Sequence, residues 1–346
     1  MIREAIASLI SGRALSEAEA TATMDEIMSG IATPSQLGAF LVALRLKGET
    51  VDEVTGMARG MRNAGVHVPL PAQTHAVDTC GTGGDGADTF NVSTAAGLLV
   101  AALGQPVAKH GNRAASSRCG SADVLEALGV KLELGPEAVA QCIERTGFGF
   151  MFAPTYHPAM RHVGPTRREI GVRTVFNILG PLTNPAGAQY QSLGVADAKL
   201  VPLMAQALLR LGCARALVVH GLDGVDEFSL SGPTLVAEVR GASGDVVEYQ
   251  VTPESVGLAE RSREELRGGD AQYNAALLRR TLSGEQTGAT ADMVALNGGA
   301  ALYVAGRVPT IAEGVRQAQD GLRSGRAIPT LDALAATSQR LAGAAA

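Results

Sequence analysis

The sequence predicts an α/β fold in which a small N-terminal helical domain precedes a larger domain with a mostly parallel central sheet flanked by helices. Three observations support this prediction. Residues 1–70 show short helical periods, a proline-containing stretch without a helical period follows at 65–75, and apolar runs then alternate with helical stretches. We therefore expect a helical domain over 1–70 and an α/β domain over 75–346.

The helical domain carries clear start and stop signals. Ser16 with Glu19 and Thr50 with Glu53 have the spacing of a capping box, in which each side chain bonds the other residue's backbone N–H. Pro34 suits the first position of another helix. Glycines that suit helix ends are Gly30, Gly48 and Gly65.

The larger domain is predicted from apolar runs and helical periods, taken in chain order. Strands are expected at 76–80, 106–110, 147–153 and 214–221. Helices are expected between them at 93–104, 121–129 and 200–212. From about 271 the chain is predicted to be helical again, with breaks at Gly284, Gly306 and Gly325.

Composition and charge exclude several classes of protein. The net charge of -5 gives no overall attraction to nucleic acid or anionic membranes, so any anion site must be locally basic. No apolar segment has the length of a membrane span. The four cysteines lack C-x-x-C spacing, which argues against zinc and against a disulfide framework. We expect a cytoplasmic protein that binds neither nucleic acid nor membranes.

A glycine-rich stretch follows the first predicted strand. Gly81, Gly83 and Gly86 match the G-x-G-x-x-G spacing of a dinucleotide-binding loop. Such a site needs an acidic residue about 20 residues further on to hold the ribose, but that region reads GQPVAKHGNR and has none. Asp85 would repel a bare pyrophosphate unless a metal ion or a sugar hydroxyl lay between, and no G-K-[ST] follows for a P-loop. We interpret the stretch as a phosphate-binding loop of another kind.

Two neighbouring stretches have the composition of anion sites. Residues 91–94, NVST, precede an apolar helix, so backbone N–H groups and two hydroxyls converge at the positive end of the helix dipole. The alternative is that Ser93 or Thr94 is only a helix cap. Residues 109–118 then place basic and hydroxyl side chains after the next strand, where the alternative is a solvated basic loop. Two anion sites on adjacent loops indicate a ligand with two phosphate groups.

An acidic cluster follows the strand predicted at 214–221. Asp223, Asp226 and Glu227 offer the hard oxygen ligands that Mg²⁺ prefers, often together with phosphate oxygens of a substrate. The alternative is an acidic surface turn. A diphosphate ligand with magnesium indicates that pyrophosphate is the leaving group.

Five long motifs, in their order along the chain, are highly specific. They are DTCGTGGDG at 78–86, NVST at 91–94, KHGNRAASSRCGSADVLEALGV at 109–130, HPAMRHVGPTRREIGVRTVFNILGPLTNP at 157–185 and GLDGVDEFS at 221–229. In these motifs the chain resembles the anthranilate phosphoribosyltransferase family over nearly its whole length. The resemblance implies a fold of the nucleoside phosphorylase/phosphoribosyltransferase type. It also implies a homodimer joined through the helical domain, with part of 158–190 packing on that domain.

The resemblance further implies a reaction. The family transfers phosphoribose from phosphoribosyl pyrophosphate to the amine of anthranilate and releases pyrophosphate, a step in tryptophan synthesis. The transition state is expected to be oxocarbenium-like, so the enzyme must stabilise the leaving group and position a weak nucleophile. No general base is obvious. Lys109, His110 and Arg113 are expected to position groups, and for His110 we favour a hydrogen bond that orients the loop over proton transfer.

Carried over residue by residue, the family's sites fall on named positions of this chain. Phosphoribosyl pyrophosphate would be held by Gly81, Gly84, Asp85, Thr89, Asn91, Val92, Ser93, Thr94, Lys109, His110, Gly111, Asn112, Arg113, Ala114, Ala115, Ser116, Ser117 and Ser121. Anthranilate would meet Gly81, Asn112 and Arg167. Ser93, Asp226 and Glu227 would ligate magnesium, with two Mg²⁺ per subunit. Tyr156 and Cys119 stand where His and Ser are frequent in the family, which puts the detail of the substrate channel in doubt.

The same residues weigh against three alternative functions. A nucleoside phosphorylase shares the fold class, but the loop DTCGTGGD matches the transferase. A non-catalytic relative that binds nucleic acid would have a basic face and would lose parts of these loops, whereas this acidic chain keeps them. The missing ribose-binding acid argues against an NAD enzyme.

Overall fold

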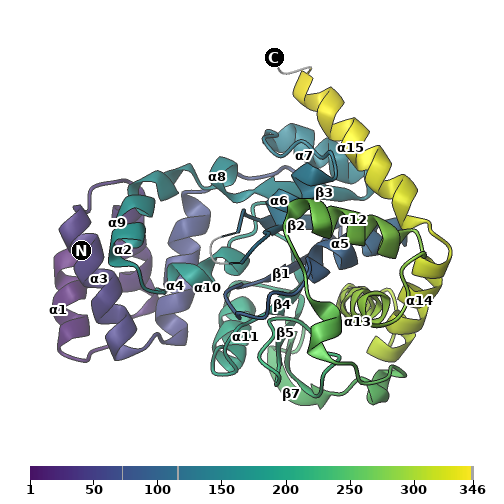
Figure 1. Ribbon diagram of the computed structural model, residues 1–346. Helices are drawn as coiled ribbons and strands as arrows, with labels where there is room; N and C mark the ends of the chain where they lie inside the picture. Colours follow the sequence, from purple (N-terminus) through teal and green to yellow (C-terminus); the bar gives the residue numbers. More distant parts are fainter. Residues whose placement is uncertain (72, 115–116, 344–346) are drawn as a thin grey trace.

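The computed structural model describes residues 1–71, 73–114 and 117–343. Figure 1 shows a bundle of helices from the N-terminal part of the chain beside a larger body built around a sheet. This arrangement confirms the predicted α/β fold with a small helical domain. Within the described ranges, no helix combines the length and the apolar character needed to cross a membrane.

The helices of the bundle begin where the start signals in the sequence predict. Its helices are α1 (Ile2–Ile10), α2 (Glu17–Met28), α3 (Pro34–Lys47) and α4 (Val51–Asn63). Capping boxes begin α2 at Ser16 and α4 at Thr50, as predicted. A third box, formed by Thr33 and Gln36, begins α3, and Pro34 is the first residue of that helix.

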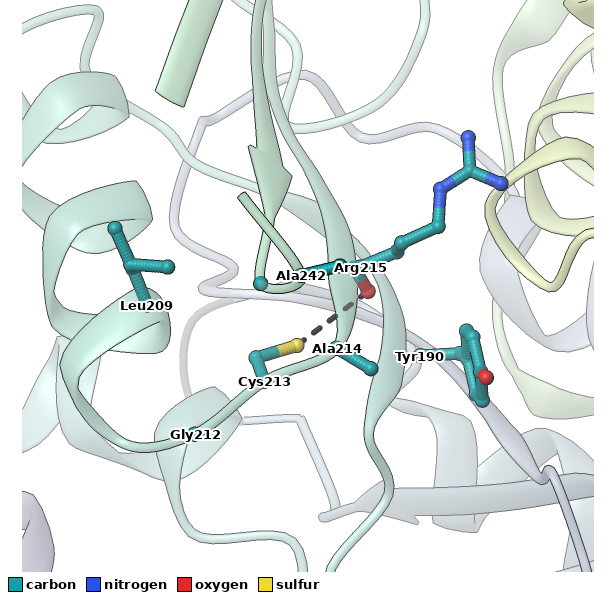
Figure 2. Close-up of a pocket in the computed structure, with 8 residues that line it drawn as sticks. Tyr190, Leu209, Gly212, Cys213, Ala214, Arg215 and Ala242 are labelled. Atoms are coloured by element: carbon teal, nitrogen blue, oxygen red, sulfur yellow. Dashed lines mark hydrogen bonds between the residues drawn. The ribbon is translucent and has the colours of Figure 1, made fainter. Parts of the chain in front are cut away.

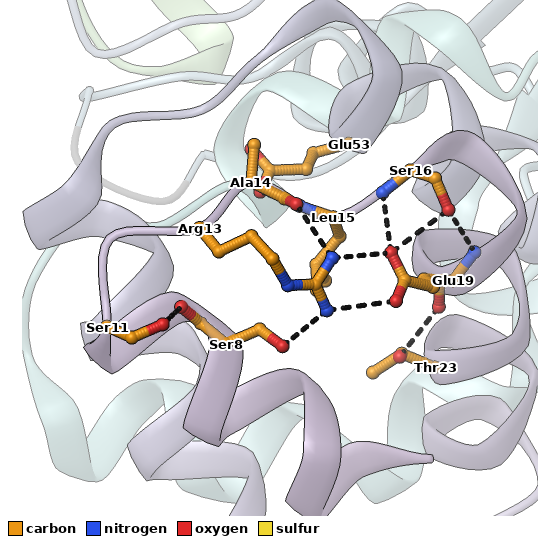
Figure 3. A network of polar contacts seen from close by, with 9 residues as sticks. All are labelled: Ser8, Ser11, Arg13, Ala14, Leu15, Ser16, Glu19, Thr23 and Glu53. Atoms are coloured by element: carbon orange, nitrogen blue, oxygen red, sulfur yellow. Dashed lines mark hydrogen bonds and ion pairs between the residues drawn. The ribbon is translucent and has the colours of Figure 1, made fainter.

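A polar network ties the start of α2 to its neighbours (Figure 3). The Arg13 guanidinium donates to Glu19, with 2.9 Å between Nη2 and Oε1, and the Ser16 N–H donates to the same carboxylate at 2.9 Å. The buried Glu53 carboxylate accepts the Leu15 N–H at 3.0 Å. These bonds fix the loop between α1 and α2 against α4.

The described strands form one seven-stranded sheet in the order β3-β2-β1-β4-β5-β6-β7. They are β1 (Val77–Gly81), β2 (Val107–Gly111), β3 (Phe148–Phe152), β4 (Tyr190–Gly194), β5 (Arg215–Gly221), β6 (Thr234–Arg240) and β7 (Asp245–Val251). The first five are parallel to one another, and β6 and β7 are antiparallel to their neighbours. The sequence predicts β1, β2, β3 and β5 but not β4, β6 or β7.

Helices connect the parallel strands and then follow the sheet. The connecting segments contain α5 (Val92–Ala102), α6 (Ser121–Ala127), α7 (Pro136–Thr146), α8 (Ala153–Tyr156), η1 (Pro158–His162), α9 (Gly164–Ile170), α10 (Phe176–Leu179), η2 (Gly180–Leu182) and α11 (Leu200–Arg210). After β7 come η3 (Glu254–Val256), η4 (Arg263–Leu266), α12 (Ala271–Leu282), α13 (Ala289–Val304), α14 (Ile311–Arg323) and α15 (Ala327–Gly343). Gly284, Gly306 and Gly325 lie between the last four helices with positive φ, which confirms the predicted breaks.

Two apolar cores lie on opposite faces of the sheet, as the alternation along β5 shows. Leu217 belongs to the core that includes α5, α7 and α13, whereas Val218 belongs to the core that includes α11 and the helical bundle. Val163 and Phe176, which come after β3 in the chain, lie in the second core. Figure 1 shows the corresponding path, in which α9 lies beside the bundle. The core of the bundle therefore continues into the core beneath α11.

Candidate active site

Four parallel strands end in glycine, and the predicted site residues follow three of these ends. The strand-ending residues are Gly81, Gly111, Gly194 and Gly221. The carboxyl ends of parallel strands meet at one edge of a sheet. A Cβ atom on Gly81 or Gly194 would collide with Asp226. Glycine at these two positions therefore lets the acidic loop after β5 lie across the ends of β1 and β4.

The loop after β1 is built from glycines in the left-handed region. Gly83, Gly84 and Gly86 have φ angles of 66°, 73° and 67°, which side chains disfavour. The Gly83 N–H donates to Oδ2 of Asp226 at 2.7 Å. Oδ2 of Asp85 accepts the backbone N–H of Asp226 at 3.3 Å. The predicted phosphate loop thus contacts the predicted metal-binding loop directly.

The first turn of α5 forms the next wall of the site. The helix begins at Val92 with Asn91 as its N-cap residue, so Ser93 and Thr94 lie inside the first turn and do not precede it, which corrects the predicted start. Neither hydroxyl is the cap. The Asn91 side chain instead fixes the loop after β2, since its amide donates to the Cys119 carbonyl at 3.1 Å.

Glu227 joins the acidic loop to α5. Its Oε1 accepts the Ser93 N–H at 3.1 Å. Burial raises the pKa of Asp226 to about 7, with the charge of Asp85 adding to the rise, and burial also raises the pKa of Glu227 well above its ordinary value. The three predicted magnesium ligands therefore lie together, and their carboxylates are in an environment where a cation would stabilise the charged form.

These ligands are not a complete metal site by themselves. Within the described parts of the chain, no three His, Cys, Asp or Glu side chains are grouped to hold a metal ion. Mg²⁺ usually takes only one or two carboxylates from a protein and completes its shell with water and substrate phosphates. Ser93, Asp226 and Glu227 fit that pattern.

Lys109 and His110 lie within β2 and not in the loop that follows it, so their side chains point to opposite faces of the sheet. Lys109 is 1% exposed, and its ammonium group donates to the Thr79 carbonyl and to Oγ of Ser93, the latter at 3.2 Å. Burial lowers the Lys109 pKa, although the nearby acids oppose this effect. Lys109 is thus a buried cation directed at the first turn of α5.

His110 points away from this cation. Its Nδ1 lies 3.2 Å from the Gly180 carbonyl, and its ring centroid lies 5.0 Å from that of His157. Burial lowers the pKa of His110 to about 3 and that of His157 to about 4. Both rings are neutral near pH 7, so His110 orients neighbouring backbone by a hydrogen bond, although its partner is η2 and not the loop after β2.

Arg113 is directed at α6. Its Nη1 lies 3.0 Å from Oδ1 of Asp123 and 2.8 Å from Oε2 of Glu126. Asp123 also accepts the Ala114 N–H at 2.9 Å. In the described residues two carboxylates of α6 hold the Arg113 guanidinium, which makes no hydrogen bond to the glycine loop, so its expected role in positioning phosphate stays a prediction.

The other predicted residues of this loop are placed by backbone contacts. Oδ1 of Asn112 accepts the Arg113 N–H at 2.8 Å, and the Asn112 carbonyl accepts a hydrogen bond from Oγ of Ser121, the first residue of α6, at 3.3 Å. Ser117 is exposed. Thr89 lies in an isolated bridge with Arg267 beside the glycine loop. Ala115 and Ser116 lie outside the described residues.

The residues predicted to bind anthranilate lie in two separate parts of the structure. Gly81 and Asn112 lie at the ends of β1 and β2, whereas Arg167 lies on α9, which contacts the helical bundle. The Arg167 guanidinium carbon is 5.4 Å from the centroid of the Phe176 ring. Burial lowers the Arg167 pKa. Arg167 is therefore a partly desolvated cation, the environment in which a bound carboxylate gains most.

Both departures from the family pattern lie at buried positions of this chain. Tyr156 is fully buried, and its hydroxyl donates to the Leu134 carbonyl at 3.0 Å. Cys119 is buried, and its carbonyl accepts the Asn91 amide.

Two further polar groups near the site were missed by the sequence analysis. Arg173 donates to the carbonyls of Gly83 and Gly84 across about ninety residues of sequence, which no local pattern can indicate. Asp78 in β1 is buried, accepts the Asn184 amide at 2.8 Å, and has its pKa raised to about 6 by burial. A carboxylate inside a strand that has no other charged residue is the signal that could have found Asp78.

A hollow of about 410 Å³ lies at the other end of the sheet (Figure 2). Tyr190 and Arg215, which line it, are the first residues of β4 and β5. Cys213 also lines it, with its sulfur 3.4 Å from the Arg215 carbonyl oxygen. The hollow is thus at the amino ends of the strands and contributes no residue to the candidate active site.

Comparison with known proteins covers both domains. Residues 73–328 match the glycosyl transferase family, a/b domain, and residues 3–65 match the glycosyl transferase family, helical bundle domain. An anthranilate phosphoribosyltransferase from Rubrobacter xylanophilus is 55% identical over 343 residues, 99% of each chain. Another, from Chloroflexus aggregans, is 56% identical over 338 residues, 98% of each chain.

Solved structures agree with these relatives. The anthranilate phosphoribosyltransferase of Thermus thermophilus is 50% identical and superimposes with a TM-score of 0.91, covering 97% of this chain and 99% of that one. The Saccharomyces cerevisiae enzyme in complex with phosphoribosyl pyrophosphate and magnesium is 26% identical, with a TM-score of 0.89 and 98% of each chain covered. On these identities and coverages, the chain belongs to the anthranilate phosphoribosyltransferase family.

Proposed function

We propose that this protein transfers phosphoribose from phosphoribosyl pyrophosphate to the amine of anthranilate and releases pyrophosphate, a step of tryptophan synthesis. The observation that carries the proposal is identity above 50% over nearly the whole chain with relatives named for this activity. The site agrees, since a glycine loop, a helix N-terminus and two acids meet at one edge of the sheet.

Phosphoribosyl pyrophosphate would lie across the ends of β1 and β2. Backbone N–H groups of the glycine loop and the first turn of α5 would face its anionic oxygens there, and the buried Lys109 would supply a fixed positive charge. Such preorganised donors favour the transition state because they need no rearrangement as charge develops on the leaving group. Arg113 can join them only if its ion pairs with α6 open.

Magnesium would be held by Ser93, Asp226 and Glu227, with two ions per subunit. The bound metal would neutralise negative charge on the pyrophosphate. Among the described residues, Asp226 accepts one N–H from Gly83 and Glu227 one from Ser93, which leaves lone pairs on both carboxylates for a metal ion. In the related yeast enzyme, magnesium and phosphoribosyl pyrophosphate were bound together.

Anthranilate would be positioned by Arg167 through its carboxylate, with Gly81 and Asn112 facing the ring. In the reaction the bond from C1 to the pyrophosphate oxygen breaks, the bond from C1 to the amine nitrogen forms, and the nitrogen loses one proton. Once its nitrogen is bonded to C1, the aromatic amine of anthranilate is acidic enough to release that proton without a strong base. His110 and His157 are neutral but are held on the far face of β2 from Lys109.

The protein would work as a cytoplasmic homodimer joined through the helical bundle. Large apolar side chains are exposed there, with Leu46 on α3 at 82% and Ile10 on α1 at 74%. A contiguous exposed apolar patch marks a surface that a partner covers, and we expect these side chains to form one. Val42, one turn before Leu46 on α3, is also exposed.

The assay is the loss of anthranilate fluorescence on mixing the protein with phosphoribosyl pyrophosphate and Mg²⁺. The proposal predicts a decline that needs all three components and that chelation of magnesium stops. Cleavage of pyrimidine nucleosides by inorganic phosphate, with anthranilate fluorescence unchanged, would instead identify a nucleoside phosphorylase.

A further inference from the structure

We infer that Arg173 is a positioning residue that aims the backbone N–H groups of the glycine loop at the pyrophosphate. The inference rests on the proposed function for the identity of the anion. Arg173 lies in the segment after α9, and its guanidinium reaches the loop after β1, so it joins two elements that the chain separates widely.

The contact is made by two nitrogen atoms to two consecutive carbonyl groups. Nη1 of Arg173 lies 3.2 Å from the Gly84 oxygen, and Nη2 lies 3.1 Å from the Gly83 oxygen. A Cβ atom on Gly84 would collide with this guanidinium. The absence of a side chain at Gly84 is therefore what lets the guanidinium reach the loop backbone.

This contact decides which way the loop amides point. In a trans peptide the C=O and the N–H lie on opposite sides, and the described residues contain no cis peptide. Because the Gly83 and Gly84 carbonyls face Arg173, the N–H groups of Gly84 and Asp85 face away from it. Within the described ranges, neither N–H donates to a protein group, so both are available to an anion. A cation on the carbonyl side also polarises each peptide and strengthens its N–H as a donor.

The loop is held on its other side by the metal-binding acids. The Gly83 N–H donates to Oδ2 of Asp226, so the Gly83 residue is fixed between Asp226 and Arg173. Loss of Arg173 would leave this residue anchored at one end only. We therefore expect the Arg173 contact to affect both the affinity for pyrophosphate and the arrangement of the Asp226 carboxylate.

The same residue connects the loop to the predicted acceptor site. Gly171 ends α9 in the left-handed conformation, and Arg173 follows two residues later. Arg167 lies on that helix, and α9 contacts α3 of the helical bundle. A movement of α9 would therefore be transmitted to the glycine loop through the guanidinium.

The test uses Arg173→Ala and Arg173→Lys, with Arg168→Ala as the matched control because Arg168 is an exposed arginine on α9. Binding of magnesium pyrophosphate is measured by calorimetry and turnover by anthranilate fluorescence. Arg173→Ala should weaken pyrophosphate binding at least about tenfold, because two charge-assisted hydrogen bonds to the loop are lost. It should also move the magnesium activation curve to higher concentration, without lowering Tm.

Two further results separate positioning from simple attraction between charges. Arg173→Lys should recover only part of the affinity, since an ammonium group cannot bridge two carbonyls with planar geometry. Added methylguanidinium should recover part of the affinity of Arg173→Ala and leave Arg168→Ala unchanged.

Three outcomes would overturn the inference. They are pyrophosphate affinity within twofold of the native protein in Arg173→Ala, full recovery in Arg173→Lys, and an unshifted magnesium curve. Calorimetry also keeps the inference distinct from the proposed function. If the native protein consumes no anthranilate while Arg173→Ala still loses pyrophosphate affinity, the proposed function is wrong and the positioning role stands.

Discussion

At the level of single residues, one buried cation and a group of acids set the charge of the candidate active site. Lys109 is directed at the first turn of α5, Asp226 and Glu227 lie close enough to affect its charge, and Asp85 contacts Asp226. The acids could be predicted because they follow a strand and so had to lie at the sheet edge. The direction of the Arg113 side chain could not be predicted. Its guanidinium could pair either with phosphate or with the carboxylates of α6, and those carboxylates come close to it only in the folded protein.

Arg167 tests how the acceptor is held. Replacing it by alanine should cost about 2 to 4 kcal/mol in kcat/KM for anthranilate if its partly desolvated guanidinium holds the carboxylate. The KM for phosphoribosyl pyrophosphate should change little. Steady-state kinetics in both substrates measure this, with Arg168→Ala as control. An unchanged kcat/KM for anthranilate would remove Arg167 from the site.

Asp226 and Glu227 test the metal site. Asp226→Asn combined with Glu227→Gln should lower turnover on the order of a hundredfold or more, because the charge that balances magnesium and pyrophosphate is lost. Higher magnesium should rescue each single variant in part and the double variant hardly at all. Initial rates against magnesium concentration give the answer, with circular dichroism as the folding control. Native rates in the double variant would show that the acids hold no metal ion that the reaction needs.

At the level of elements, the strands missed by the sequence analysis share a physical reason. β4 contains the polar residues Gln191 and Ser192, yet both are buried. The Gln191 amide is satisfied by the Pro181 carbonyl at 2.7 Å, a partner that only the folded chain provides. β6 and β7 extend the sheet at its antiparallel edge, where β7 is half-exposed and carries polar residues. Apolar runs alone therefore predicted β1, β2, β3 and β5 and missed strands whose polar groups are satisfied by tertiary contacts.

The glycine loop can be tested as an element. Alanine at Gly84 would be strained by about 1 to 2 kcal/mol in the left-handed region and would also displace Arg173. Gly84→Ala should therefore weaken phosphoribosyl pyrophosphate binding by about tenfold or more. Gly86→Ala is the matched control, since its φ is also positive but a Cβ there would meet nothing within 4 Å. Equal loss of affinity in both variants would assign the effect to backbone strain alone.

Across the whole molecule, the helical bundle shares its apolar core with one face of the sheet. Phe40 of α3 and Val218 of β5 belong to the same core, and α9 and α10 run between the bundle and the sheet. The capping boxes and the proline of the sequence indicated the bundle. They could not indicate how the bundle joins the sheet, because that depends on residues such as Val163 and Phe176 far along the chain.

The exposed apolar side chains of the bundle predict a change of oligomeric state. Leu46→Glu would place a charge in the proposed dimer interface, and a buried unpaired charge is strongly unfavourable. The variant should therefore run as a monomer at micromolar concentration while the native protein runs as a dimer, in size-exclusion chromatography with light scattering. Tyr273→Glu, at an exposed position on α12, should leave the dimer intact. A dimeric Leu46→Glu protein would place the interface elsewhere.

The most direct test of the transferase reaction is its stoichiometry. Anthranilate consumption and pyrophosphate release are followed together in one reaction containing phosphoribosyl pyrophosphate and Mg²⁺, with the Asp226→Asn, Glu227→Gln double variant as the blank. The proposed reaction predicts one pyrophosphate released for each anthranilate consumed by the native protein and neither change above background in the blank. Pyrophosphate release without loss of anthranilate, or no release at all from well-folded native protein, would contradict it.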